Sequence, residues 1–206
     1  MNKHTEQRLI AGPAGIIECA IDQPAADKTL RGVIVLAHPH PLFGGTMDNK
    51  VVQTLVRAFL QLGYRTVRFN FRGVGQTEGS HDDGRGECED LLAVVAAYRE
   101  ENLPLALGGF SFGAYVTTLA AARLAEAGQA AERLALVGPS TQRAVPAAVP
   151  EDTLVIHGET DEVVPLSATL DWARPQHLPV IVMPGVGHFF HGQLTQLRNL
   201  LVRSWS

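Results

Sequence analysis

Cysteine, long apolar runs and clustered positive charge are all scarce in this chain of 206 residues. The two cysteines, Cys19 and Cys88, are too few for a disulfide framework, so both are predicted to be free thiols. No run of about 18 apolar residues occurs, which argues against a membrane-spanning helix. The polar segment 1–7 lacks the apolar core of a secretory signal. These absences predict a soluble cytoplasmic protein with no membrane partner.

Charge of one sign is not concentrated in any part of the chain. The formal net charge is −4, and the Lys and Arg residues are scattered. Because binding to a phosphate backbone needs a basic patch, no nucleic-acid partner is predicted. With 46% apolar residues and no internal repeat, residues 1–206 are predicted to form a single domain around one core. The sequence does not determine the oligomeric state.

Short apolar runs alternate with helix-like runs. The apolar runs, mostly β-branched as in strands buried on both faces, are 33–37, 66–70, 104–110, 134–137, 154–157 and 180–183. A further strand near 15–21 is predicted to lie antiparallel at one edge. Helices are predicted at 49–62, 87–100, 112–127, 166–173 and 192–202. This alternation predicts an α/β fold with a doubly wound, mostly parallel sheet.

Residues Gly109-Phe110-Ser111-Phe112-Gly113 form a G-x-S-x-G pattern between a predicted strand and a predicted helix. This is the setting of a nucleophile elbow, in which a sharp turn holds a serine in a strained backbone conformation and glycines leave room for it. The first N–H groups of the helix then point at the space above the serine oxygen. Phe112 is therefore predicted to be one donor of an oxyanion hole.

An acid and a histidine follow this serine, each just beyond a predicted strand. They are Asp161 and His188, and the carboxyl ends of parallel strands meet at one edge of a sheet. A serine hydroxyl is a weak nucleophile, so Ser111 needs a base, for which His188 is suited, and Asp161 would orient the imidazole. Glu159 and Glu162 flank Asp161 and compete with it for the role of the acid.

Further motifs lie at strand ends in the same order along the chain. They are HPHPLFGGTM (38–47), FNFRGVG (69–75), the elbow, HGETDEVVP (157–165) and GHF (187–189). Together they resemble the α/β-hydrolase superfamily, and within it small bacterial serine hydrolases related to dienelactone hydrolase. The resemblance implies a minimal α/β-hydrolase fold without a lid domain and a serine hydrolase that needs no cofactor. The expected activity is carboxylesterase-like, through an acyl-serine intermediate and a catalytic triad of Ser111, His188 and Asp161.

The second donor of the oxyanion hole is expected from the loop after the first parallel strand. Pro39 and Pro41 have no N–H, which leaves His40, Leu42 or Phe43. In enzymes similar to dienelactone hydrolase the donor is the residue before an aromatic-Gly pair. That residue is Leu42 here, with His40 as the alternative.

Only the segment 138–152 is available where this superfamily often builds a lid. The site is therefore predicted to be open and shallow and to bind a small-molecule acyl substrate with a short or medium chain. His40, Phe43, Phe110 and Phe190 are predicted to contact this substrate. Amides, thioesters and lactones stay open, because all pass through the same oxyanion. Acyltransferase or cofactor-free perhydrolase activity, or a binding module without catalysis, are the alternatives.

Two further groups of polar residues receive simpler interpretations. The spacing of His38, His40, His157 and His191 matches no zinc pattern, so no metal site is predicted, and His157 is expected to cap a strand end or to hydrogen-bond in the core. The acidic residues are predicted to form a solvated helix start: Asp82, Asp83, Glu87, Glu89 and Asp90.

Overall fold

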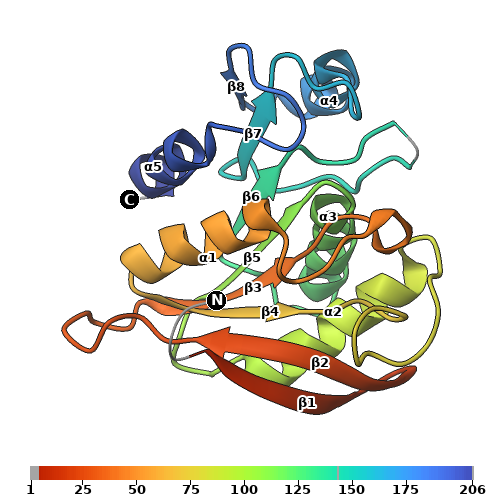
Figure 1. The fold of residues 1–206 in the computed structure, drawn as a ribbon, viewed down its shortest axis with the longest axis vertical. Coiled ribbons are helices and arrows are strands. Elements are labelled where there is room, and N and C mark those ends of the chain that lie inside the picture. Colours follow the sequence, from red (N-terminus) through yellow and green to blue (C-terminus); the bar gives the residue numbers. More distant parts are fainter. Residues whose placement is uncertain (1–4, 143, 206) are drawn as a thin grey trace.

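The computed structural model describes residues 5–142 and 144–205. Its strands are β1 (Glu6–Gly12), β2 (Gly15–Asp22), β3 (Gly32–Ala37), β4 (Tyr64–Phe69), β5 (Leu105–Phe110), β6 (Arg133–Val137), β7 (Leu154–Gly158) and β8 (Val180–Met183). They form one sheet in the order β1-β2-β4-β3-β5-β6-β7-β8 (Figure 1). Strands β3 to β8 are parallel, whereas β1 and β2 are antiparallel to their neighbours. The predicted doubly wound, mostly parallel sheet is confirmed.

Helices cover both faces of this sheet. They are α1 (Lys50–Gln61), α2 (Arg85–Tyr98), α3 (Phe112–Glu126), α4 (Leu166–Ala173) and α5 (Leu194–Trp205), with short 3₁₀ turns at Pro41–Phe43 and Arg174–Gln176. The apolar faces of α1 and α5 pack on one side of the sheet, and those of α2 and α3 on the other. In the described chain, no helix is long and apolar enough to cross a membrane.

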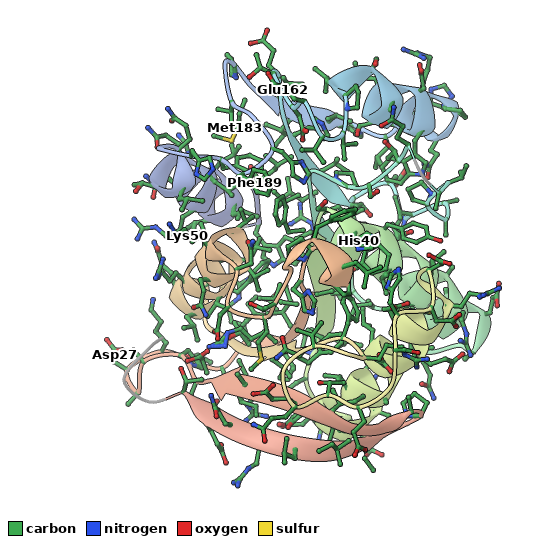
Figure 2. The ribbon with its side chains drawn as sticks, turned by 45° about the vertical axis from the view of Figure 1, so that its right-hand side comes forward. Asp27, His40, Lys50, Glu162, Met183 and Phe189 are labelled. Carbon is green, nitrogen blue, oxygen red and sulfur yellow. The ribbon has the colours of Figure 1, made fainter. Side chains whose placement is uncertain are left out.

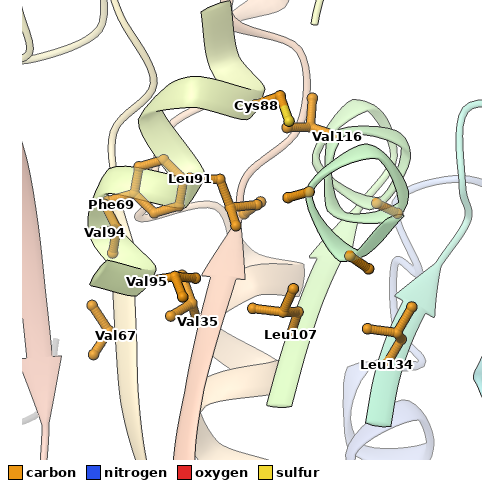
Figure 3. Close-up of a cluster of buried hydrophobic side chains, with 14 of the residues drawn as sticks. Val35, Val67, Phe69, Cys88, Leu91, Val94, Val95, Leu107, Val116 and Leu134 are labelled. Carbon is orange, nitrogen blue, oxygen red and sulfur yellow. The ribbon is translucent and has the colours of Figure 1, made fainter. Parts of the chain in front are cut away.

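The core under α2 and α3 helps to explain why the sequences of the central strands β3 and β5 are continuous apolar runs. Val35 and Leu107 project from neighbouring parallel strands toward Leu91 and Val95 of α2 (Figure 3). The opposite faces of the same strands meet α1 and α5. Because both faces of β3 and β5 are buried, neither strand shows an alternation of polar and apolar residues.

The prediction that strand 15–21 lies at the edge of the sheet is wrong. It is antiparallel, as expected, but β1 pairs with its outer side. Most of β1 is exposed to solvent, so its sequence carries no apolar periodicity that could reveal a strand.

The strand order reverses at β3, which has β4 on one side and β5 on the other. At such a switch point the loops after adjacent strands diverge and leave a crevice at the carboxyl edge. The loops that follow β3 and β8 both reach this edge, where His40 and Phe189 are labelled in Figure 2.

The predicted solvated helix start at α2 is only partly right, since Asp83 and Glu89 are exposed but other acids of this segment are not. Glu87 and Asp90 are buried. Glu87 accepts the backbone N–H groups of Asp82 and Gly84 at 2.9 and 2.8 Å. Asp90 receives Nε and Nη2 of Arg72 at 3.0 and 2.8 Å. These carboxylates therefore fix the loop between β4 and α2, and only a partner distant in the sequence makes the burial of Asp90 possible.

Candidate active site

Ser111 occupies the turn between β5 and α3. Its φ of 57° and ψ of −119° are a strained combination for a residue with a side chain. Gly113 makes the turn possible, because a Cβ there would lie 2.4 Å from the carbonyl oxygen of His38. The serine backbone is fixed on both sides: its N–H donates to Val137 O at 2.9 Å, and its carbonyl accepts Ser140 N at 3.1 Å. The strain is thus held by the packing of the helix start against neighbouring backbone.

His188 bridges the serine and the acid. Its Nε2 lies 2.9 Å from Ser111 Oγ, and its Nδ1 lies 2.6 Å from Asp161 Oδ2. The other carboxylate oxygen of Asp161 accepts the N–H groups of Val163 and Val164 at 2.9 and 2.8 Å. All three side chains are largely buried. The structure therefore brings together, in one hydrogen-bonded series, residues that lie far apart in the sequence.

The electrostatics of Asp161 favour its ionised form. Burial raises the pKa of its carboxyl, but hydrogen bonds from His188 and from the N–H of Val164 outweigh burial, so the pKa lies below its ordinary value. An ionised Asp161 accepts the Nδ1–H of His188 and leaves Nε2 to face the serine. The alternatives for the acid point elsewhere: Glu159 accepts the N–H of Gly185 at 2.8 Å, and Glu162 is exposed.

Two further histidines are buried near the site and have structural contacts. His157 lies with Nε2 2.9 Å from Val164 O and 3.5 Å from Asp161 Oδ2. His38 accepts the N–H of Phe71 on Nε2 at 3.0 Å, which leaves Nδ1 to donate to Pro39 O at 2.6 Å. Burial lowers the pKa of both, to about 4 for His38. Both imidazoles are therefore neutral and hold the loops around the site.

The loop after β3 folds back on itself at His40. The N–H of Leu42 donates to His40 Nδ1 at 3.3 Å, and the N–H groups of Phe43 and Gly45 donate to the carbonyl of His40 at 3.1 and 3.0 Å. The His40 ring packs against Phe43 and Phe112, with centroids 4.8 Å apart in each pair. Leu42, predicted as an oxyanion donor, thus has its N–H directed at the His40 ring, and its side chain is 69% exposed.

A cavity of about 380 Å³ opens beside Ser111. It is lined by Pro39, His40, Phe43, Gly44, Gly45, Asn49, Ser111, Phe112, Ser140, Gln142, Val163, Val164, His188 and Phe189. His40 and Phe43 thus lie in its wall, as does Phe112. Among the lining residues that sequence reasoning missed, Asn49 and Gln142 lie outside all of the motifs, and Val163 lies within 157–165, where only the acidic residues were considered for a catalytic role.

The prediction that Phe110 and Phe190 contact substrate is wrong for this cavity. Both are 0% exposed. Phe110 packs beneath the His188 ring, with centroids 5.0 Å apart, and Phe190 packs on Phe110 in the core. A φ of 51° at Phe190 accompanies this inward direction. The wall is formed instead by Phe189, which is 48% exposed.

Potential metal ligands are dispersed among the residues that the structure describes. Within residues 5–142 and 144–205, no group of three or more His, Cys, Asp or Glu side chains is arranged to hold a metal ion. The buried histidines have the hydrogen-bond partners described above.

Comparison with known proteins identifies the family. A family model described as serine aminopeptidase, S33 (Hydrolase_4) matches residues 28–152. The chain belongs to this family. An α/β serine hydrolase without a lid from Xanthomonas campestris has 38% identity and a TM-score of 0.89, covering 99% of this chain and 94% of that one. An α/β serine hydrolase homologue from Coxiella burnetii has 41% identity and a TM-score of 0.82, covering 98% and 97%. The predicted superfamily and lidless fold of this serine hydrolase are confirmed.

Curated relatives of this serine hydrolase match over a shorter length. An uncharacterized protein of Rickettsia prowazekii is 38% identical over 109 residues, which are 51% of this chain and 44% of that protein. The lysophosphatidylserine lipase ABHD12 of Danio rerio is 32% identical over 111 residues, 51% of this chain and 29% of that protein. The chain therefore matches less than half the length of either relative. The narrower resemblance to dienelactone hydrolase stays a prediction.

Proposed function

We propose that this serine hydrolase is an esterase that cleaves small carboxylic esters through an acyl-serine intermediate. The observation that carries the proposal is the series Ser111, His188 and Asp161, joined at 2.9 and 2.6 Å at the wall of an open cavity. The base lies within hydrogen-bond reach of both the nucleophile and the orienting acid, which is the geometry that activates a hydroxyl group.

In the proposed mechanism Ser111 Oγ attacks the carbonyl carbon of the ester, and His188 Nε2 takes the hydroxyl proton. Asp161 keeps the imidazole in the required tautomer and stabilises the imidazolium that forms. His188 then returns the proton to the leaving alcohol, and the acyl group stays on Ser111. Water attacks this acyl-serine by the same route, which releases the acid and restores the enzyme.

The oxyanion that forms during each attack needs two N–H donors. Phe112 supplies the first proposed donor, because it begins α3, where N–H groups have no partner within the helix. For the second we favour His40 over Leu42. The N–H of Leu42 points to the His40 ring, and those of Phe43 and Gly45 point to the His40 carbonyl. His40 lines the cavity together with Phe112, and the two rings pack against each other with centroids 4.8 Å apart, which supports His40 by its position next to the first donor.

Ester substrates fit the cavity better than the amino-terminal residues of peptides, which the family description suggests. A peptide amino terminus carries a positive charge, and burying a charge is costly unless it is paired. Of the described residues that line the cavity, none is Asp or Glu. A neutral ester needs no such partner.

The proposal is tested by hydrolysis of p-nitrophenyl acetate. We expect turnover by the wild-type chain and none above background by Ser111→Ala. Ser80→Ala, a matched change at an exposed serine outside the cavity, should retain wild-type turnover. Undiminished hydrolysis by Ser111→Ala would refute the proposal.

A further inference from the structure

A second cavity, of about 390 Å³, adjoins the first. It is lined by Thr160, Glu162, Val163, Gly185, Val186, Gly187, His188, Phe189, His191 and Gln193. Val163, His188 and Phe189 line both cavities. The two cavities therefore lie on either side of these shared residues, and the second is bounded by the loop after β7 and the loop after β8.

The proposed mechanism, on which this inference rests, gives the two cavities different roles. Ser111 and Phe112 line only the first cavity, so the carbonyl group and its acyl chain belong there. The leaving oxygen must receive its proton from His188. A group attached to that oxygen extends past His188, which is the direction of the second cavity.

We propose that the second cavity binds the alcohol part of the ester and selects an alcohol that carries a positive charge. The substrates would then be esters of amino alcohols or of quaternary ammonium alcohols.

The lining of the second cavity has the chemistry that such a cation requires. Glu162 contributes an exposed carboxylate. Phe189 presents an aromatic ring that is half exposed, and a cation over such a ring is attracted to its face.

The charge of the lining also argues against an anionic alcohol. Among the described residues of the second cavity there is no Lys or Arg, and Glu162 is the acidic one. A phosphorylated or sulfonated alcohol would place like charge beside this carboxylate. An uncharged alcohol would be neither attracted nor repelled by the carboxylate of Glu162.

A charge series of esters with the same acyl group tests the inference. Butyrylcholine carries a positive charge, neohexyl butyrate is its uncharged isostere, and sulfoethyl butyrate is negative. At about pH 8 we expect kcat/KM to fall in that order. For an exposed pair the step from cation to neutral isostere should be about threefold, and it should shrink as salt is added.

The matched variants are Glu162→Gln and Glu159→Gln, which remove one carboxylate each from the same loop. Glu162→Gln should bring the ratio of kcat/KM for butyrylcholine and neohexyl butyrate close to one. Glu159→Gln should keep the wild-type ratio, because Glu159 is turned to the N–H of Gly185 and glutamine retains an oxygen that accepts it.

The outcomes separate this inference from the proposed function. Hydrolysis of all three esters at equal kcat/KM, or a charge preference that persists in Glu162→Gln, overturns the role of the second cavity and leaves the esterase intact. Absence of hydrolysis of these esters and of p-nitrophenyl acetate overturns both.

Discussion

The floor of the site and its mouth are built from different kinds of contact. On the floor, Ser111, Asp161 and His188 are buried and each is hydrogen-bonded to another element. At the mouth, Phe43 is largely exposed and Phe189 is half exposed. If the proposed function holds, the difference teaches that the chemical step should depend on a fixed network, whereas the choice of substrate should depend on exposed side chains of the loops.

The largest expected effect comes from the floor. Asp161→Asn should lower kcat for p-nitrophenyl acetate by about 10⁴, because an amide in place of the carboxylate favours the wrong tautomer of His188. Glu159→Gln is the control and should change kcat little, since this carboxylate faces Gly185. A loss of less than about tenfold in Asp161→Asn would place the acid elsewhere.

Two neighbouring phenylalanines lie in different surroundings: Phe190 is buried in the core below the site, and Phe189 is half exposed at the mouth. Phe190→Ala should lower the free energy of unfolding by about 3–5 kcal/mol, because it leaves a cavity in the core under His188. Phe189→Ala should cost less than about 1 kcal/mol and instead raise KM. Urea unfolding and steady-state kinetics measure the two effects. Equal destabilisation by both changes would contradict the division.

The buried His38 makes the free energy of unfolding of the chain depend on pH. Its pKa is lowered to about 4 in the folded chain, whereas an unfolded imidazole has an ordinary pKa of about 6.5. The unfolded state therefore binds more protons between these values, so the contribution of His38 is complete above the upper one. It is lost as the pH falls toward the lower one, by up to about 3 kcal/mol.

Urea unfolding at about pH 7.5 and about pH 5 measures this loss. The buried His157, whose pKa is also lowered, acts in the same direction. His38→Gln should lose less stability than the wild-type chain over this range. An identical loss in both proteins would exclude His38 as a source of the pH dependence.

The smallest expected effect concerns the mouth alone. In a series of p-nitrophenyl esters, acetate and butyrate should have a kcat/KM no lower than that of dodecanoate, because methylene groups that stay in water beyond an open cavity gain no burial energy. A kcat/KM that rises through dodecanoate would show that the exposed rings of the mouth bind a long chain.

The sequence predicts the floor far better than the mouth, and the reason is physical. Strand ends can be found from apolar runs, and parallel strands bring their ends together, so Ser111, Asp161 and His188 could be chosen without coordinates. The direction of adjacent side chains in a loop cannot be read in this way. Phe189 and Phe190 have identical chemistry, and a positive φ at Phe190 accompanies their different environments.

Other misses follow from contacts between distant segments. From the sequence, Asp90 is expected to be a solvated acid, but in the structure Arg72, from the loop after β4, pairs with it in α2. Strand β1 is exposed along most of its length and owes its pairing to β2, so no local pattern marks it. The N–H of Leu42 is the expected donor by resemblance, yet a 3₁₀ turn aims it at His40.

The most direct test of the central claim is mass spectrometry of the chain after reaction with a fluorophosphonate probe. A single adduct on Ser111, absent from Ser111→Ala and strongly slowed in Asp161→Asn, is the predicted result. An unmodified Ser111 in folded wild-type protein, or an equal rate of labelling in Asp161→Asn, would contradict the account.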